Sequence, residues 1–300
     1  MIAYIPSPSS GVFHLGPLPI HAYGMMIAIG VIAGAWLGGR ELERIGGGTT
    51  EQFSSAATWG VVAGIIGARL YHVITAWELF SNDLGRIPKI WEGGLGIPGG
   101  LILGIPVGLW IGRRRGVSMS ALATAAAPAI PLAQSIGRWG NWWNQELYGR
   151  PTTLPWGLKI DPEHRQASVQ QYSTFHPTFL YESLWNLGLC LVLLWISRHV
   201  RLKPGRLLAL YVAGYGVGRF WVESLRIDPA KSGGGLRLNQ WMAIAAVVLA
   251  VLFMVAFGLR DRSEPALVDE DDVVEETELA DVVEETELTN DDHLPSDNLT

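Results

Sequence analysis

The chain has 300 residues, of which 49% are apolar and 17% are charged, against about 25% charged residues in soluble domains. This composition excludes a largely disordered or nucleic-acid-binding protein and favours the membrane, while the single cysteine, Cys190, excludes an intramolecular disulfide and a cysteine-based zinc site. The charge is uneven: residues 261–300 hold 16 acidic residues and one basic residue, whereas residues 1–260 hold 21 basic and 12 acidic residues.

Seven apolar stretches reach or approach the length of about 20 helical residues that a hydrocarbon core of about 30 Å requires. They are residues 22–39, 54–77, 93–112, 118–137, 178–197, 206–225 and 238–259. The fourth is interrupted by Pro128 and Pro131, and the second carries a Gly60-x-x-x-Gly64 spacing that lets helices approach closely in lipid. We predict an all-α polytopic membrane protein with seven transmembrane helices within residues 1–260.

Basic residues predict how these helices are oriented. No Lys or Arg precedes Arg40, so the first stretch lacks the charged start of a cleavable signal peptide and is predicted to be an uncleaved helix. With the amino terminus outside, the inner segments contain 11 basic residues, including the arginine run 113–115, against nine in the outer segments, a modest bias in keeping with the positive-inside rule. Seven crossings then place the carboxyl terminus in the cytoplasm.

Two segments outside the apolar stretches have distinct compositions. Residues 139–177 form a long outer connection with four tryptophans, which suit a membrane–water interface, and we predict a small extracytoplasmic head there. Residues 261–300 are acidic, contain no aromatic residue and repeat one octapeptide at 272–279 and 281–288. Such a segment cannot bury enough apolar surface to fold, so we predict a disordered cytoplasmic tail with a solvating rather than a docking role.

The sixth apolar stretch ends with charged residues that a membrane helix rarely contains. Tyr215, Arg219, Glu223 and Arg226 follow one another at spacings of four, four and three residues, which places them on one helical face. One interpretation is a stripe of ion pairs that joins helices, with a second carboxylate neutralising the second arginine. The other is an anion site, because two guanidinium groups outnumber one carboxylate and match a phosphate in geometry.

A second polar cluster occupies residues 137–150, at the outer end of the fourth stretch. It combines a cation, two carboxamides, a carboxylate and glycines, in the residues Arg138, Asn141, Asn144, Glu146 and Gly149. It is either a polar interface loop anchored by tryptophans or a cradle for a lipid headgroup, in which glycine lets the backbone approach the ligand. His176 and His21 open two helices on the same side, although a histidine at a helix entry is commonly a capping or packing residue.

Several function classes have no support in the chain. There is no phosphate-binding glycine loop, no His-Glu-x-x-His zinc motif and no Gly-x-Ser-x-Gly nucleophile elbow, and no inverted repeat supports a transporter. Cys190 lies among Leu and Val and is interpreted as a packing thiol. Two non-enzymatic interpretations stay open. One is a lipid binder or flippase that binds a headgroup with the same arginines, and the other is a structural membrane protein whose buried charges only form ion pairs.

The pattern Gly137-Arg138-x-Gly140-Asn141-x-x-Asn144-x-Glu146-x-x-Gly149 resembles the signature of the bacterial prolipoprotein diacylglyceryl transferases. The resemblance extends over about residues 14–258. It includes five further motifs, which are His21-x-Tyr23-Gly24, Gly67-Ala-Arg69-Leu-Tyr71, Gly99-Gly100, His176-Pro-x-x-Leu-Tyr181-Glu182 and the residues from Tyr215 to Arg226. The acidic tail lies outside it.

This resemblance implies a reaction, its partners and its residues. The family transfers the sn-1,2-diacylglyceryl group of phosphatidylglycerol to the lipobox cysteine of a prolipoprotein signal peptide, in the bacterial inner membrane, and releases glycerol phosphate. The catalytic residues that we expect are Tyr23, Arg138, Glu146, Arg219 and Glu223. The substrate-binding residues that we expect are Arg138, Asn141, Asn144, Gly149, Arg226, Tyr215, His176, Gly99 and Gly100. The partners are the two substrates and the bilayer, and the chemistry requires neither metal nor cofactor.

Within this hypothesis, Arg138 and Arg219 bind and stabilise the leaving phosphate, and the two glutamates position the arginines. The nucleophile is the thiolate of the substrate, whose pKa of about 8.5 calls for a nearby cation or base. Many family members have a histidine immediately before the two glycines of the third stretch, whereas this chain has Pro98. The proton acceptor is therefore left open among His21, His176, a carboxylate and water.

Overall fold

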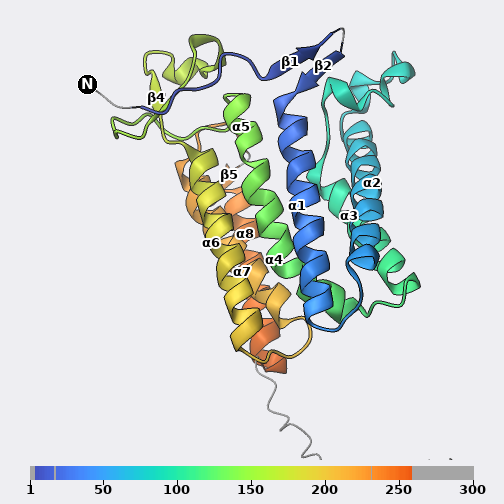
Figure 1. Cartoon of the computed structure of the whole chain (residues 1–300). Coiled ribbons are helices and arrows are strands. Elements are labelled where there is room, and N and C mark those ends of the chain that lie inside the picture. Colours follow the sequence, from blue (N-terminus) through green and yellow to red (C-terminus); the bar gives the residue numbers. More distant parts are fainter. Residues whose placement is uncertain (1–3, 17, 231, 259–300) are drawn as a thin grey trace, which may run out of the picture. The chain divides into compact units, whose positions relative to one another are not determined.

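The computed structural model describes residues 4–16, 18–230 and 232–258, and this part of the chain is mostly helical (Figure 1). The predicted acidic tail, residues 261–300, lies outside the described residues. Each predicted apolar stretch overlaps one helix of 18 to 26 residues. These helices are α1 (Ala22–Arg44), α2 (Thr50–Thr75), α3 (Ile97–Arg114), α4 (Met119–Gly137), α6 (Thr178–His199), α7 (Arg206–Leu225) and α8 (Leu238–Phe257).

Five helical segments in the described ranges are long and apolar enough to cross a membrane. They are Ala22–Arg44, Thr50–Thr75, Met119–Trp143, Thr178–His199 and Leu238–Phe257. Helices α3 and α7 are not among them, because α3 carries glycines, prolines and a terminal arginine pair, and α7 carries the charged residues noted above. The chain is thus a helical membrane protein, and the crossing of the membrane by α3 and α7 stays a prediction.

Local signals explain where several helices begin. Helix α2 starts with a capping box: Thr49 accepts from the backbone N–H of Gln52, and the Gln52 side chain accepts from the backbone N–H of Thr49. The Ser118 hydroxyl caps α4 by accepting from the backbone N–H of Ala121. Gly205 precedes α7 with a φ of 78°, a left-handed conformation that favours glycine.

Helix α4 is the centre of the helical bundle. It packs against α1, α6 and α7, and α7 packs in turn against α8. It runs without a break through Pro128 and Pro131, both fully buried, so the interruption that the sequence suggested is absent. Prolines are tolerated in membrane helices where neighbouring helices pack around them, which is the position of α4 in Figure 1.

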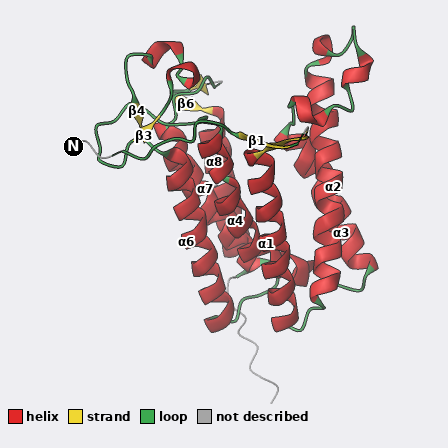
Figure 2. Cartoon of the chain, turned by 45° about the horizontal axis from the view of Figure 1, so that its top comes forward, coloured by secondary structure: helices red, strands yellow, loops and turns green. Residues whose placement is uncertain are grey.

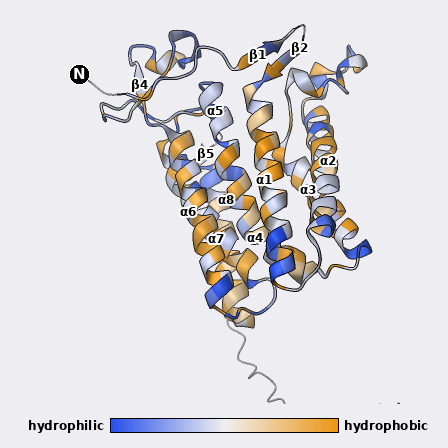
Figure 3. Ribbon diagram, viewed as in Figure 1, coloured by the Kyte–Doolittle hydropathy of each residue, from blue (hydrophilic) through white to orange (hydrophobic). Residues whose placement is uncertain are grey.

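The ends of the helices differ from their middles. Figure 3 shows apolar residues along the helices and hydrophilic residues at the end where α1 and α6 finish. There the buried Glu41 lies 2.7 Å from a guanidinium nitrogen of Arg44 and 3.5 Å from one of Arg198, so a carboxylate links the ends of α1 and α6. Polar residues at this end favour contact with water, while the apolar middle favours lipid.

Helices α2 and α3 form a pair that meets through glycines. A Cβ placed on Gly67 would lie 2.3 Å from the carbonyl oxygen of Gly99, and one on Gly99 would lie 2.2 Å from that of Gly67. Gly60 and Gly104 approach each other in the same way one to two turns further along. The two backbones are therefore in direct contact, the arrangement that small residues permit between helices in lipid. The predicted role of the glycine spacing in α2 agrees with this packing.

Arg69 stabilises the loop between α2 and α3. Its buried guanidinium group donates to the carbonyl oxygens of five loop residues, which are Arg86, Ile87, Lys89, Gly93 and Gly94. It also lies 5.1 Å from the ring centre of Phe80. The loop contains three short 3₁₀ helices, Trp77–Leu79, Leu84–Arg86 and Ile90–Glu92. This charge near a membrane span therefore organises a loop rather than a ligand site.

Residues 139–177 fold as a small cap at one end of the helices (Figure 2). They contain the short helix α5 (Trp139–Trp143), the strands β3 (Leu158–Lys159) and β4 (Thr174–Phe175), and two 3₁₀ turns. The strands pair antiparallel with Leu158 opposite Phe175, over an apolar cluster completed by Tyr148, Ile160 and Phe179. Two hairpins lie outside this segment: β1 (Val12–Leu15) with β2 (Leu18–His21), and β5 (Ser232–Gly233) with β6 (Leu236–Arg237).

Candidate functional site

Glu182 lies at the centre of the candidate site, between two arginines from different helices. Its Oε2 atom is 2.6 Å from Nε of Arg138, which ends α4, and its Oε1 atom is 3.1 Å from Nη1 of Arg219 on α7. Glu182 is in the second turn of α6, so the charges of three helices meet at one level. The two arginines, 81 residues apart in the sequence, thus share one buried carboxylate.

Glu223 forms the second half of this ionic cluster. Its side chain is fully buried, and its Oε2 atom lies 2.7 Å from Nη2 of Arg219. Its Oε1 atom lies 3.0 Å from Nε of Arg237 and accepts a hydrogen bond from the carboxamide of Asn239. Arg226, one turn after Glu223, is 4.0 Å away. Arg237 and Asn239 open α8, so Glu223 ties α7 to α8.

Asp228 completes the cluster at its outer edge. Its carboxylate oxygens lie 2.7 Å from Nε of Arg226 and 3.0 Å from Nη2 of Arg237. Burial acts to raise the pKa of Asp228, but the hydrogen bond from Arg226 and the charges of Arg226 and Arg237 outweigh it and lower that pKa. Asp228 therefore stays ionised at neutral pH and keeps the two arginines oriented.

The charge balance of the cluster corrects the prediction that two arginines outnumber one carboxylate. Glu182 supplies the second carboxylate that the ion-pair interpretation required, so pairing of Arg219 is complete: its two terminal nitrogens contact Glu182 and Glu223. Arg138 differs, because its shortest contact with Glu182 is through Nε, and its terminal nitrogens donate no hydrogen bond to the described residues. The Arg138 side chain is 21% exposed, and a partly exposed guanidinium group of this kind can bind an anion through its terminal nitrogens.

The predicted carboxamide cluster lies directly after Arg138. Asn141, in α5, donates to Oε1 of Glu146 at 2.8 Å, and Asn144 donates to the same oxygen at 3.4 Å. The ring of Tyr23, in the first turn of α1, lies against Gly140, where a Cβ would be 2.6 Å from a ring carbon. The phenol interacts with Asn141, Glu146 and Arg138. The structure therefore brings together Tyr23, Arg138, Asn141, Asn144 and Glu146, as the sequence predicted.

The backbone on either side of Glu146 is strained. Gln145 and Leu147 have φ values of 51° and 58°, which non-glycine residues rarely adopt. Gln145 is held there by three hydrogen bonds: its amide donates to the Pro8 carbonyl and to Asp161, and its oxygen accepts from the backbone N–H of Asp161. Strain that is stabilised from several sides is typical of functional loops, and here it aims Glu146.

Gly149 lies where this loop returns to the helices. A Cβ on Gly149 would be 2.8 Å from Cβ of His176 and 3.0 Å from the carbonyl oxygen of Leu225. Gly149 pairs with Arg226 in an isolated β-bridge, which ties the cap to the end of α7. The contacts of Gly149 are thus with protein backbone, and they explain the glycine as a packing requirement.

His176 is in hydrogen-bond contact with a neighbouring tyrosine. Its Nδ1 atom lies 3.1 Å from the Tyr181 hydroxyl, which also accepts from the indole N–H of Trp156. Burial lowers the pKa of His176, and the charge of Arg150 lowers it further, so the ring is neutral at pH 7. His21, the other histidine considered as a proton acceptor, is exposed at the start of α1.

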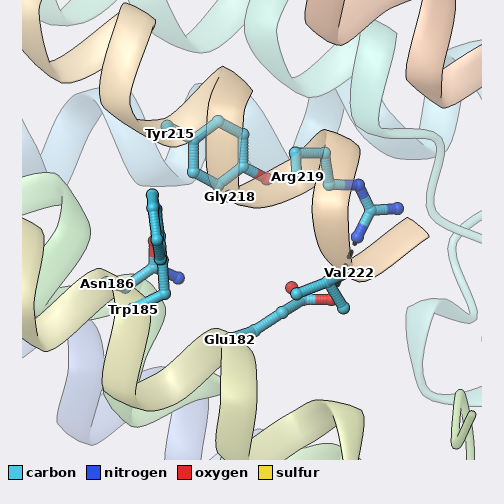
Figure 4. Close-up of a pocket in the computed structure, with 7 residues that line it drawn as sticks. All are labelled: Glu182, Trp185, Asn186, Tyr215, Gly218, Arg219 and Val222. Carbon is cyan, nitrogen blue, oxygen red and sulfur yellow. Dashed lines mark hydrogen bonds and ion pairs between the residues drawn. The ribbon is translucent and has the colours of Figure 1, made fainter. Parts of the chain in front are cut away.

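A small pocket lies beside the ionic cluster, between α6 and α7 (Figure 4). About 200 Å³ there is not filled by atoms, and this space includes the open region outside the protein. Its lining residues are Glu182, Trp185, Asn186, Tyr215, Gly218, Arg219 and Val222. The predicted binding residue Tyr215 is therefore one helical turn from Arg219 in the wall of the same pocket.

Two predicted binding residues lie elsewhere. Gly99 and Gly100 contact α2 in the glycine interface described above, where their nearest neighbours belong to Gly67, Tyr71, Gly64 and Ala68. The preceding Pro98 is in the first turn of α3, a position that suits proline. These glycines therefore have a packing explanation that needs no substrate.

Sequence reasoning gave no site role to several residues that the structure places in the cluster. Glu182 ends the motif that begins at His176, and its charge within an apolar stretch is the signal that the sequence offers. Arg237, Asp228 and Asn239 had no comparable signal, because they lie in a connection and at a helix start where polar residues are ordinary. Gln145 was missed because backbone strain is not visible in a sequence.

The fold and the site define a class of protein: a helical membrane protein with a cluster of buried arginines and carboxylates next to an arginine that is open to an anion. Comparison with known proteins makes this specific. Residues 10–256 match the prolipoprotein diacylglyceryl transferase family, and the chain belongs to that family.

Individual relatives agree with this assignment. The chain is 52% identical over 263 residues to phosphatidylglycerol–prolipoprotein diacylglyceryl transferase 2 of Streptomyces coelicolor, an alignment that covers 86% of this chain and 82% of that protein. It is 50% identical to the phosphatidylglycerol–prolipoprotein diacylglyceryl transferase of Cutibacterium acnes, with 85% and 87% covered, and 45% identical to that of Rhodococcus jostii, with 89% and 78% covered. The family resemblance seen in the sequence is confirmed.

Proposed function

We propose that this protein transfers the diacylglyceryl group of phosphatidylglycerol to the lipobox cysteine of prolipoproteins, the first step of bacterial lipoprotein maturation. The observation that carries the proposal is the position of Arg138. It is anchored on Glu182 through Nε, its terminal nitrogens donate no hydrogen bond to the described residues, and it adjoins Tyr23, Asn141 and Glu146. Family membership supplies the reaction, and this geometry supplies the place for a phosphate.

The proposal includes an orientation in the bacterial inner membrane. We place the cap of residues 139–177 and the amino terminus outside, all seven long helices across the bilayer, and the carboxyl terminus in the cytoplasm. The basic ends of α1, α3 and α6 support this choice, because they lie together at the end of the bundle away from the cap. The arginine cluster then lies at the level of the outer headgroups.

The reaction is a displacement at carbon. The thiolate sulfur of the lipobox cysteine forms a bond to the glycerol carbon that carries the phosphate ester, and the carbon–oxygen bond breaks. Its electron pair leaves with glycerol phosphate. The site therefore needs no nucleophile of its own, which agrees with the buried position of Cys190 among apolar residues of α6.

Arg138 stabilises the leaving phosphate. Negative charge increases on the phosphate oxygens as the carbon–oxygen bond breaks, and donors aimed at such charge contribute a few kcal/mol each, about 3 kcal/mol in measured cases. The terminal nitrogens of Arg138 can donate two parallel hydrogen bonds to one phosphate, a bidentate contact. Arg219, paired with two carboxylates, holds Glu182 in place and so orients Arg138.

The thiol proton goes to Glu146. This carboxylate is exposed and is held by two carboxamides rather than by a guanidinium group, so it is accessible and not neutralised by an ion pair. His176 is a poorer acceptor, because its Nδ1 atom is engaged with Tyr181. Pro98 at the position of the family histidine requires such an acceptor elsewhere.

The test uses the full-length protein in phosphatidylglycerol vesicles with a lipobox peptide. The expected result is a diacylglyceryl mass increase on the peptide together with release of glycerol phosphate. A peptide with serine in place of the cysteine is the matched control and gains no mass. Headgroup binding or lipid movement without a thioether product would contradict the proposal and favour a lipid binder or flippase.

A further inference from the structure

The residues before the first long helix pack against the polar loop of the candidate site. We refer to residues 5–13 as the amino-terminal segment. The indole N–H of Trp142 donates to the Pro6 carbonyl oxygen at 3.0 Å, and the carboxamide of Gln145 donates to the Pro8 carbonyl oxygen at 3.0 Å. The segment therefore binds two side chains of the loop through its own main chain.

The amino-terminal segment also contacts the two loop residues in between. The ring of Phe13 lies 5.2 Å from the ring of Trp143 in an edge-to-face arrangement. A Cβ placed on Gly11 would lie 3.1 Å from the side-chain oxygen of Asn144. The contacts thus cover four consecutive loop residues, and the residue that follows them, Glu146, is exposed.

Both ends of the amino-terminal segment are fixed by backbone hydrogen bonds. At its start, the N–H of Ile5 donates to the Gly157 carbonyl oxygen, and the N–H of Lys159 donates to the Ile5 carbonyl oxygen, each at 2.9 Å. At its other end, the N–H of Ala22, the first residue of α1, donates to the Gly11 carbonyl oxygen at 2.8 Å. Paired main-chain groups hold the segment in one path between the cap and α1.

Gln145 is the residue at which the amino-terminal segment, the cap and the loop meet. Its side chain is buried, and besides Pro8 its carboxamide nitrogen donates to Oδ2 of Asp161 at 2.7 Å. Its carboxamide oxygen accepts from the backbone N–H of Asp161 at 2.8 Å. Every polar group of this side chain is thereby paired, and the three hydrogen bonds hold the φ of 51° at this position.

This anchoring sets the direction in which the chain enters Glu146, because the backbone has only two soft dihedrals per residue. We propose that Gln145 is a positioning residue: joined to the amino-terminal segment and to Asp161, it places Glu146 so that its carboxylate takes the proton of the substrate thiol. The inference rests on the proposed function. In this step the S–H bond breaks, the proton moves to a carboxylate oxygen of Glu146, and the electron pair stays on the sulfur.

The test measures kcat of the wild-type protein and of Gln145→Gly at pH 7 and at pH 9, with phosphatidylglycerol vesicles and a lipobox peptide. Glycine adopts the positive φ but removes the three hydrogen bonds. A thiol with a pKa of about 8.5 is about 3% ionised at pH 7 and mostly ionised at pH 9, so it needs a proton acceptor mainly at the lower pH.

Relative to the wild-type protein, kcat of Gln145→Gly should fall about tenfold or more at pH 7 and by less than about twofold at pH 9. The KM for phosphatidylglycerol should stay within about twofold, because Arg138 binds the phosphate. Tyr23 and Arg138 face Glu146, and Asp161 faces Gln145, in the wild-type protein and the variant alike. The ratio of the two proteins at each pH therefore removes the titration of these groups.

Three further variants complete the comparison. Gln171→Gly, at an exposed glutamine of the cap, is the matched control and should follow the wild-type protein at both pH values. Glu146→Gln should show the same pH-dependent loss, and a larger one at pH 7. Asp161→Ala removes one of the three hydrogen bonds of Gln145 and should lose about threefold in kcat at pH 7 and nothing at pH 9.

The outcomes separate this inference from the proposed function. An equal loss at both pH values in Gln145→Gly would overturn the inference, because Gln145 would then be only structural, and so would wild-type kcat at pH 7. If Gln145→Gly does not fold, the same two results in Asp161→Ala decide. An equal loss at both pH values in Glu146→Gln would overturn the inference and leave the transferase activity intact. Absence of any thioether product from the wild-type protein would overturn the proposed function and this inference together.

Discussion

Two parts of the bundle hold their helices together in opposite ways. Helices α2 and α3 meet through glycines, with backbone against backbone and no charge between them. Helices α4, α6, α7 and α8 meet through buried arginines and carboxylates at one level. Small residues give close packing in lipid and leave no polar atom free. In the ionic arrangement the terminal nitrogens of Arg138 donate no hydrogen bond to the described residues, and polar atoms of this kind can bind a ligand.

Removal of the shared carboxylate should break the ionic region most severely. Glu182→Gln leaves Arg138 and Arg219 without their common partner, and loss of one member of a buried ion pair costs about 3–5 kcal/mol. We expect kcat/KM to fall by about 1,000-fold or more, together with a large decrease in Tm in detergent. Glu163→Gln, at an exposed carboxylate of the cap, is the control. Normal turnover in Glu182→Gln would mean that the cluster has no part in the reaction.

The role of the terminal nitrogens of Arg138 can be tested with a substitution that disturbs the fold less. Arg138→Lys keeps the charge and its attraction to Glu182 but loses the two-pronged contact with a phosphate. The expected loss in kcat/KM is about 100-fold, with a Tm change of less than about 3 °C. Arg40→Lys, at an exposed position on α1, should have neither effect. Full activity in Arg138→Lys would transfer the phosphate contact to another residue.

A larger residue in the glycine interface should lower the stability of the protein and leave its turnover nearly unchanged. In Gly67→Ala the new methyl group would lie 2.3 Å from the Gly99 carbonyl oxygen, so α2 and α3 must separate, at a cost of about 1–3 kcal/mol. Turnover at low temperature should stay within about twofold of wild type. Gly188→Ala, in α6 with no atom near the new methyl group, is the control. A loss of activity without a loss of Tm would restore Gly99 and Gly100 as substrate-binding residues.

The smallest expected effect concerns pH. Because the pKa of His176 is lowered from 6.5 in the folded protein, the unfolded chain binds the proton more readily, and stability falls as the pH drops below about 6.5. Since the side chain is partly exposed, replacement by Gln should reduce this acid-dependent decrease in Tm by about 2 °C or less. Thermal unfolding of both proteins at pH 5.5 and pH 7.5 measures the difference. An unchanged pH dependence would assign the acid sensitivity to other groups.

The fold was largely predictable, since a continuous apolar stretch of about 20 residues has few alternatives to a helix in lipid. The site was predictable where residues are close in sequence, as in the Arg138–Glu146 segment, or on one helical face, as from Tyr215 to Glu223. The sharing of Glu182 by two arginines was not, because it depends on how three helices are placed in space. The substrate-binding role predicted for Gly99 and Gly100 has instead a packing explanation, because the same residue type serves a helix contact and a close ligand approach.

Arg69 has a consequence for how the loop between α2 and α3 can evolve. Its hydrogen bonds to the loop go to main-chain carbonyls, which every residue type possesses, and its guanidinium group also packs on the ring of Phe80. Many positions of the loop can therefore change their side chain while the loop retains its path. The exceptions are Gly93 and Gly94, whose φ values are positive, Phe80, and Arg86 and Lys89, which have contacts of their own. A saturation scan of residues 81–85 should record broad tolerance, whereas substitution of Arg69 itself should not be tolerated.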